Sequence, residues 1–167
     1  MKKHQNLINQ LCKNNREQSS EASNILLELA KNDNSIVPLL INKMNSPNAT
    51  AYTNNRIALV FREIKDERAF PAILNAIRYP KDRNNISTLV YALENYNCEK
   101  IFLKIFCLFV KSEKADVMWS AYYILKNQAF YIRTKDMVKA QKILDNSSLS
   151  DDDRITAQNM IEHFSNS

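Results

Sequence analysis

The sequence contains no glycine among its 167 residues. Glycine is indispensable in several functional loops, because only its backbone readily adopts the conformations that they need. Its absence excludes the G-x-G-x-x-G dinucleotide turn, the Walker A phosphate loop, the EF-hand calcium loop and the Asn-Gly hairpin. A fold built from β-strands would also need glycine at many of its turns. The missing residue therefore argues for a helical protein outside these nucleotide-binding and calcium-binding classes.

Cysteine and histidine are scarce and widely separated. The three cysteines, Cys12, Cys98 and Cys107, are odd in number and show no Cys-x-x-Cys spacing. A disulfide framework and a zinc site are therefore not expected, and the pattern is typical of a reducing compartment. The two histidines, His4 and His163, stand near opposite ends of the chain. A nucleophile with a histidine base is not expected either, since the two groups must lie within hydrogen-bond reach.

The run Asp151-Asp152-Asp153 is the one acidic cluster that could suggest a metal. It lacks the glycine and the distal glutamate of a calcium loop. We interpret it as the first turn of a final helix, where acids interact favourably with the positive end of the helix dipole. These patterns together predict a protein that is not an enzyme and that uses no cofactor and no metal.

Long apolar runs are missing as well. The most apolar stretch, 101–110, is interrupted by Lys104 and is shorter than the roughly 20 residues that cross a bilayer. No apolar run of signal-peptide length follows the lysines at positions 2 and 3. We therefore expect a cytoplasmic protein without a membrane partner. Apolar residues still make up 45% of the chain, which is sufficient for a packed core.

Apolar residues recur at the i, i+3, i+4 and i+7 spacing of amphipathic helices along most of the chain. Short polar segments separate them, so neighbouring helices should be antiparallel. With no glycine available, we expect asparagine to adopt the left-handed conformation at helix ends, at Asn32, Asn45, Asn97, Asn127 and Asn146. The predicted helices span 4–14, 20–31, 35–44, 49–64, 67–78, 83–95, 98–111, 115–126, 135–145 and 151–164.

A shift of 32 residues aligns two helical pairs of the sequence with each other. Eight positions are apolar in both copies: Ile57/Leu89, Ala58/Val90, Phe61/Leu93, Ile64/Tyr96, Phe70/Phe102, Ile73/Ile105, Leu74/Phe106 and Ile77/Phe109. A helical hairpin of this length cannot bury both of its apolar stripes alone, whereas stacked copies can. The spacing therefore predicts an internal repeat of about 32 residues.

The segment 57–77, IALVFREIKDERAFPAILNAI, resembles a HEAT-like (armadillo-type) helical repeat. In that family a first helix rich in Ala and Leu ends in an acidic turn, and a second helix begins with an apolar-Pro-x-apolar pattern. The resemblance is good over 54–78, partial over 20–45 and 83–111, and weak over 115–145. It implies a right-handed α-solenoid of antiparallel hairpins, about ten helices in one domain (1–167). Helix 4–14 would cap the N-terminal end, about four hairpins would occupy 20–145, and helix 151–164 would cap the C-terminal end.

The second helices of HEAT-like hairpins line a concave face, so the same resemblance selects the candidate contact residues. On this register the face is basic and rich in amides. A solvated outer surface without a partner would explain the charge equally well. The residues predicted to contact a partner are Arg68, Asn75, Arg78, Lys100, Lys104, Cys107 and Lys111.

Aromatic residues gather in one segment of the sequence. Trp119, Tyr122 and Tyr123 fall at i, i+3 and i+4, followed by Phe130 and Tyr131. This spacing predicts that they form a core stripe. Two alternatives are an anchor for a protein interface, since Trp and Tyr dominate binding hot spots, and a platform for stacking nucleic-acid bases.

Two functions remain open on these grounds. The first is a non-catalytic module that binds one protein partner through the concave face. The net charge of +5 would favour an acidic partner, such as a toxin or a regulated enzyme. By resemblance, a stoichiometric inhibitor such as a bacterial toxin-immunity protein fits this description. The second is a nucleic-acid-binding HEAT-like protein of the DNA-glycosylase kind, with Asp116 and Trp119 as a conceivable pair, although the charge is moderate for that role.

Overall fold

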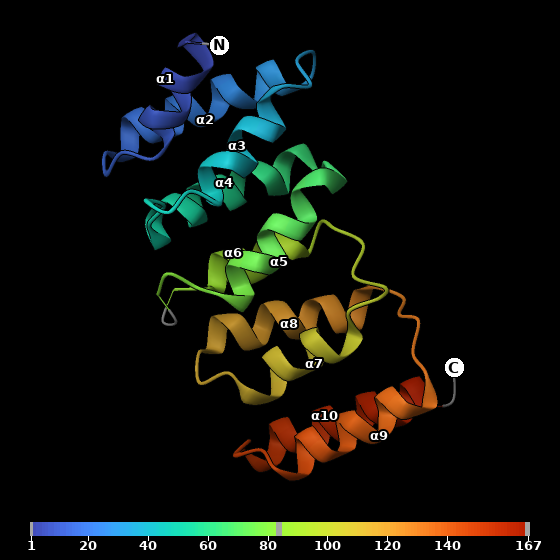
Figure 1. Cartoon of the computed structure of the whole chain (residues 1–167). Coiled ribbons are helices and arrows are strands. Elements are labelled where there is room, and N and C mark those ends of the chain that lie inside the picture. Colours follow the sequence, from blue (N-terminus) through green and yellow to red (C-terminus); the bar gives the residue numbers. More distant parts are fainter. Residues whose placement is uncertain (1, 83–84, 166–167) are drawn as a thin grey trace. The chain divides into compact units, whose positions relative to one another are not determined.

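A computed structural model describes residues 2–82 and 85–165. The described residues form ten α-helices and one short 3-10 helix without any strand, which confirms the predicted all-α class (Figure 1). The chain divides into unit 1, residues 1–96, and unit 2, residues 97–167. Unit 1 contains α1 (Lys2–Leu11), α2 (Arg16–Ala30), α3 (Ile36–Met44), α4 (Ala51–Ile64), η1 (Glu67–Ala69), α5 (Phe70–Arg78) and α6 (Ser87–Leu93). Unit 2 contains α7 (Phe102–Lys111), α8 (Ala115–Asn127), α9 (Thr134–Asp145) and α10 (Asp151–Ser165).

All ten predicted helices are present, and some of their boundaries differ from the predicted ones because of local hydrogen bonds. The second helix begins at Arg16 and not at 20, because the Asn15 side chain accepts a 3.0 Å hydrogen bond from the Gln18 amide. The helix predicted at 98–111 begins only at Phe102, since residues 98–101 form a turn closed by the Ile101 amide and the Cys98 carbonyl. The helix predicted at 83–95 is described as Ser87–Leu93, and positions 83–84 lie outside the described residues.

The prediction that asparagines end the helices in a left-handed conformation is wrong. Among the described residues only Lys65, at the end of α4, has a positive φ, of 56°. Asn45 and Asn146, for example, have φ of −82° and −96°. Several helices end instead with a hydrogen bond from an amide to the carbonyl three residues earlier. The Ser46 amide, for example, donates to the Lys43 carbonyl at 3.2 Å. This geometry satisfies the last carbonyls without a residue in the left-handed region.

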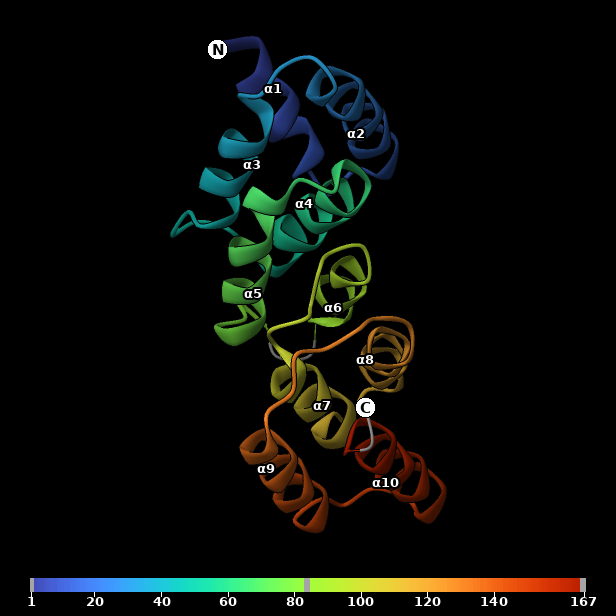
Figure 2. The same cartoon turned by 90° about the vertical axis from the view of Figure 1, so that its right-hand side faces the viewer.

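The helices of unit 1 form two layers (Figure 2). In one layer α2 packs against α4 and α4 packs against α6, while in the other α3 packs against α5. Helix α1 packs against α2 and α3. Contacts between α3 and α4, and between α5 and α6, join the layers. This arrangement buries the apolar stripe of each helix between its sequence neighbour and the next helix of its own layer.

The apolar positions that the 32-residue shift aligns belong to the interior. Phe61, Leu93 and Phe106, for example, are completely buried. Of the sixteen positions, thirteen are buried, and Ile64, Phe70 and Leu74 are half-buried. The second helices of the two aligned pairs, α5 and α7, begin at Phe70 and Phe102, and thus keep the same spacing. The sequence pattern therefore identified the core positions of α4 to α7.

Unit 2 is organised around Phe102, at the start of α7. Its ring stacks on Phe106 with centroids 5.7 Å apart and meets the edges of Phe130 and Phe164 at 5.7 and 5.3 Å. Phe130 lies in the segment between α8 and α9, and Phe164 lies in α10. Helix α7 also packs against both α8 and α9, and α9 packs against α10. The aromatic cluster therefore ties α10 and the 128–133 segment to α7.

Candidate functional site

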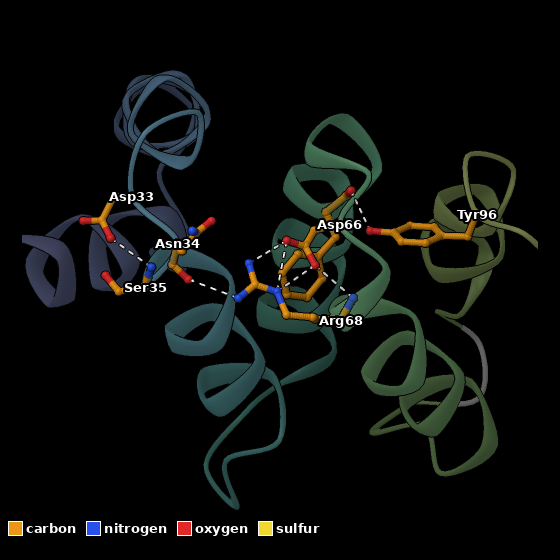
Figure 3. A network of polar contacts seen from close by, with 7 residues as sticks. Asp33, Asn34, Ser35, Asp66, Arg68 and Tyr96 are labelled. Atoms are coloured by element: carbon orange, nitrogen blue, oxygen red, sulfur yellow. Dashed lines mark hydrogen bonds and ion pairs between the residues drawn. The ribbon is translucent and has the colours of Figure 1, made fainter.

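Arg68, the first of the predicted contact residues, is already engaged within unit 1 (Figure 3). Its Nη2 atom lies 2.6 Å from Asp66 Oδ2, and its Nε atom donates to Asp66 Oδ1 at 2.9 Å. The Nη1 atom also donates to the Asn34 carbonyl at 3.4 Å. Arg68 thus links η1 to the turn between α2 and α3. Its charge is offset by Asp66, so it stabilises the fold and offers a partner only part of its side chain.

The electrostatics of this network follow from its hydrogen bonds. The hydrogen bonds from Arg68 lower the pKa of Asp66, and they outweigh the opposite effect of burial, so this pKa lies below its ordinary value. The Tyr96 hydroxyl nearby donates to the Phe61 carbonyl at 2.7 Å. Burial raises the pKa of Tyr96, so this phenol stays protonated at neutral pH and remains a donor. The cluster is structural in character, because its polar atoms are used within the protein.

The six other predicted contact residues lie on helices or next to one. Asn75 and Arg78 are exposed on α5, and the Arg78 guanidinium lies 5.2 Å from the centroid of the Tyr79 ring. Lys100 precedes α7 and is exposed. On α7 itself the residues fall at i, i+3 and i+7 and therefore share a face: exposed Lys104, half-buried Cys107 with a free thiol, and exposed Lys111.

In unit 2 the structure brings Lys100 and Lys104 into one pocket. A cavity of about 460 Å³ is lined by these lysines, by residues 101–103 at the start of α7, and by Tyr131, Arg133 and Asp136. The Tyr131 amide donates to the Glu99 carbonyl at 2.9 Å, which fixes the 128–133 segment beside the start of α7. The Tyr131 side chain is 66% exposed. We call this site the basic pocket.

The charge of the basic pocket is not cancelled within the protein. Arg133 Nε donates to Asp136 Oδ2 at 2.9 Å, and this hydrogen bond keeps the pKa of Asp136 below its ordinary value. The carboxylate is therefore ionised and committed to Arg133. Neither Lys100 nor Lys104 forms an ion pair with any residue that the structure describes. The first turn of α7 also lacks a side-chain cap at Ile101. The pocket is thus suited to an anionic group.

The prediction of an aromatic core stripe on α8 is wrong for two of its three members. Trp119 is 69% exposed and Tyr123 is 53% exposed, while Tyr122 is half-buried. The interior is contacted instead by a neighbouring stripe of α8. Its buried members are Val117, Ala121, Ile124 and Leu125. Both stripes satisfy helical spacing, so periodicity alone could not decide between them.

Two further cavities lie side by side between α8 and α10. One, of about 330 Å³, is bordered by Trp119, and the other, of about 460 Å³, is bordered by Lys126 and His163. Tyr122 and Thr156 line both cavities, so the two adjoin at these residues and are treated together as one groove. We call it the α8–α10 groove. It has no lining residue in common with the basic pocket.

Other chemistry-bearing residues are used structurally or lie alone. Burial raises the pKa of Cys12, which keeps its thiol protonated. Asp116, which the sequence pairs with Trp119, accepts a hydrogen bond at 3.0 Å from the neighbouring Val117 amide. No group of three or more His, Cys, Asp or Glu side chains is placed to hold a metal ion in the described part of the chain. Within residues 2–82 and 85–165, no helix combines the length and the apolar character needed to cross a membrane.

Sequence reasoning found two lysines of the basic pocket and missed its other wall. Tyr131 was grouped with the aromatic residues, and Arg133 and Asp136 carried no signal of their own. The i, i+3 relation of Arg133 and Asp136 could have indicated the capping pair at the start of α9.

The comparisons with known proteins add no family to this description. No protein-family model matches the sequence, and no significant match occurs among curated proteins.

Proposed function

We propose that this protein is a non-catalytic binding module whose basic pocket receives acidic side chains of one protein partner. The observation that carries the proposal is the convergence of Lys100, Lys104, Arg133 and Tyr131 on one cavity. Three cations and a single carboxylate line it, and Arg133 already pairs with that carboxylate. The pocket therefore retains a positive charge that an Asp or Glu of a partner would complement.

The remaining chemistry of the pocket suits a protein partner. Tyr131 presents a large side chain that is 66% exposed, and exposed tyrosines are frequent energetic anchors of interfaces. Cations at the rim of an interface accelerate association with an acidic partner by long-range attraction. A stable complex would bury about 800 Å² on each side, so the contact must extend from the pocket onto neighbouring surface. Lys111, exposed further along α7, is suited to such an extension.

The finer architecture and the biological role form part of the same proposal. The two-layered helix packing of unit 1 and the 32-residue spacing between the starts of α5 and α7 support a right-handed HEAT-like α-solenoid. Within that family resemblance, we propose a stoichiometric inhibitor of the toxin-immunity type, acting in the cytoplasm. Three free cysteines are in keeping with a reducing compartment.

The test is affinity capture with quantitative mass spectrometry, using the full chain as bait. Bait variants are Lys100→Glu/Lys104→Glu and a control with the same net charge, Lys13→Glu/Lys114→Glu, whose lysines are also exposed. We expect one dominant partner of acidic character, retained by the control and reduced at least tenfold by the pocket variant. Equal recovery by all three baits would refute the basic pocket as the binding site.

The captured sample and the purified protein can also distinguish a protein partner from a nucleic-acid partner. Binding to phosphates loses orders of magnitude in affinity between about 50 and 200 mM salt. We therefore expect a fluorescent single-stranded or double-stranded DNA probe to bind weakly, and the captured partner to survive nuclease treatment. A nuclease-sensitive capture together with a steep salt dependence would instead favour the nucleic-acid function.

A further inference from the structure

The α8–α10 groove offers a second binding surface that does not depend on the basic pocket. Its walls come from two parallel helices, because the early residues of α8 and α10 border one end and the late residues border the other. On α8 the walls fall at helical spacing, at Ala115, Met118, Tyr122 and Leu125. Such spacing places these side chains on one continuous face of the helix.

The groove lies beside the packed interior of unit 2. Helix α8 directs its buried stripe, which includes Ala121 and Ile124, into the unit, and α10 does so with Ala157 and Ile161. Among the lining residues, Phe109 and Leu125 are buried in the interior and Phe164 packs on Phe102, whereas Met118, Trp119 and Thr156 border the groove without being buried. Thr156, half-buried at the middle of the groove, is small and leaves the space between the helices open.

Exposed aromatic surface borders this space. Among the aromatic rings of the described residues, Trp119 pairs with Tyr122 alone, in a T-shaped arrangement with centroids 5.9 Å apart. Trp119 keeps 69% of its surface accessible. A tryptophan that becomes buried removes on the order of 150–250 Å² from water. Exposed apolar surface of this kind, beside a groove, is characteristic of an interaction site.

The charge along the groove identifies the occupant. At the Trp119 end the cavity is lined by Asp153, and Asp116 is exposed in the first turn of α8. At the other end the wall contains the cationic side chain of Lys126. The groove therefore changes from acidic to basic along its length. A segment that complements it carries basic residues at one end, and a cation there can also stack on the Trp119 ring.

We propose that the α8–α10 groove binds an amphipathic helix of a partner protein. Such helices bind grooves through apolar residues at i, i+3, i+4 and i+7. The groove spans Ala115 to Lys126, or about 17 Å at 1.5 Å per residue, which matches three helical turns. The apolar stripe of the partner fills the two cavities that meet at Tyr122 and Thr156, and its Lys or Arg residues lie next to Asp153.

A library of 14-residue helical peptides displayed on phage tests this proposal with the full-length protein. Peptides are selected on the wild type and counter-selected on Trp119→Ser/Thr156→Arg, in which the anchor is lost and the groove is filled. Far-UV circular dichroism and thermal unfolding confirm that the variant is folded. We expect enriched peptides with apolar residues at helical spacing and with Lys or Arg toward one end.

Trp119 is the only tryptophan of the chain, so its fluorescence reports binding directly. We expect a selected peptide without tryptophan to shift the emission to shorter wavelength. Its affinity should fall at least tenfold in Thr156→Arg and stay within twofold in Tyr131→Ser, a control that removes an exposed aromatic ring outside the groove. Lys100→Glu/Lys104→Glu should also leave it unchanged, which separates this surface from the basic pocket.

Four results would overturn the proposal. If no peptide is enriched on the wild type over the variant, the groove is not a binding site. If the enriched peptides are acidic throughout, the proposed charge pattern is wrong. An affinity that is unchanged by Thr156→Arg places the binding elsewhere. A dimer of the wild type alone, detected by sedimentation and dissociated by Thr156→Arg, would assign the groove to a second copy of this chain.

Discussion

Introducing the first glycine of this chain, by Lys65→Gly, should stabilise the protein. Lys65 ends α4 with φ 56° and ψ 32°, while its amide donates to the Phe61 carbonyl at 2.9 Å. The left-handed conformation costs a residue with a Cβ atom roughly 1–2 kcal/mol. Glycine avoids this cost, keeps the amide donor, and loses about 0.4–1 kcal/mol through the larger entropy of the unfolded chain. We expect a net gain of about 0.5–1 kcal/mol in the free energy of unfolding.

Thermal unfolding followed by circular dichroism, with urea denaturation in parallel, measures this gain. For a unit of this size, 1 kcal/mol corresponds to about 4–8 °C in Tm, so a rise of about 2–8 °C is expected. The matched control is Glu21→Gly, which is exposed within α2 and should lose about 1 kcal/mol. Lys65→Val should also destabilise, because a β-branched residue resists positive φ. If Lys65→Gly lowers Tm as Glu21→Gly does, the left-handed cap is refuted.

Three further variants test contacts within unit 1. Phe61→Ala removes a fully buried ring and should cost about 3–5 kcal/mol in urea denaturation, whereas a near-neutral result would contradict its place in the core. Tyr96→Phe should cost only about 0.5–1.5 kcal/mol, because the Phe61 carbonyl still accepts from the Lys65 amide, and a larger loss would show that this carbonyl depends on the phenol. Asp66→Asn bears on acid stability. Folding lowers the pKa of Asp66 below 3.8. The ionised carboxylate therefore contributes to the free energy of unfolding above that pH, and this contribution is lost as the pH falls through the pKa of Asp66 in the folded state. The variant should therefore be less stable at pH 7 and lose less stability between pH 4 and 2, and parallel pH profiles would argue against the ion pair with Arg68.

Helix existence was predictable because it depends on local properties. The i, i+3, i+4 pattern places apolar residues on one face whatever the helix later contacts, and all ten predicted helices are present. Boundaries were less predictable, since they depend on single hydrogen bonds such as that of the Asn15 side chain at the start of α2. The helix ends show the same limit. Among the described residues Lys65, and no asparagine, is left-handed.

The candidate surfaces required contacts between residues that are distant in the sequence. Lys100 and Lys104 were identified from the repeat register, but the tyrosine that shares their pocket stands 27 residues beyond Lys104, at position 131. The exposure of Trp119 was not predicted either. Two stripes on α8 have helical spacing, and only the packing of α7 against α8 selects which one is buried.

The sequence by itself determined the helical class, the approximate helix ranges and the apolar faces, since these depend on interactions within a few residues. Only the tertiary structure decided that Arg68 is held by Asp66, that the lysines before and within α7 share a pocket with Tyr131, and that α8 and α10 leave a groove between them. The physical reason is that a side chain's burial and charge environment are set by the helices packed around it. Those neighbours come from segments whose relative position no local pattern encodes.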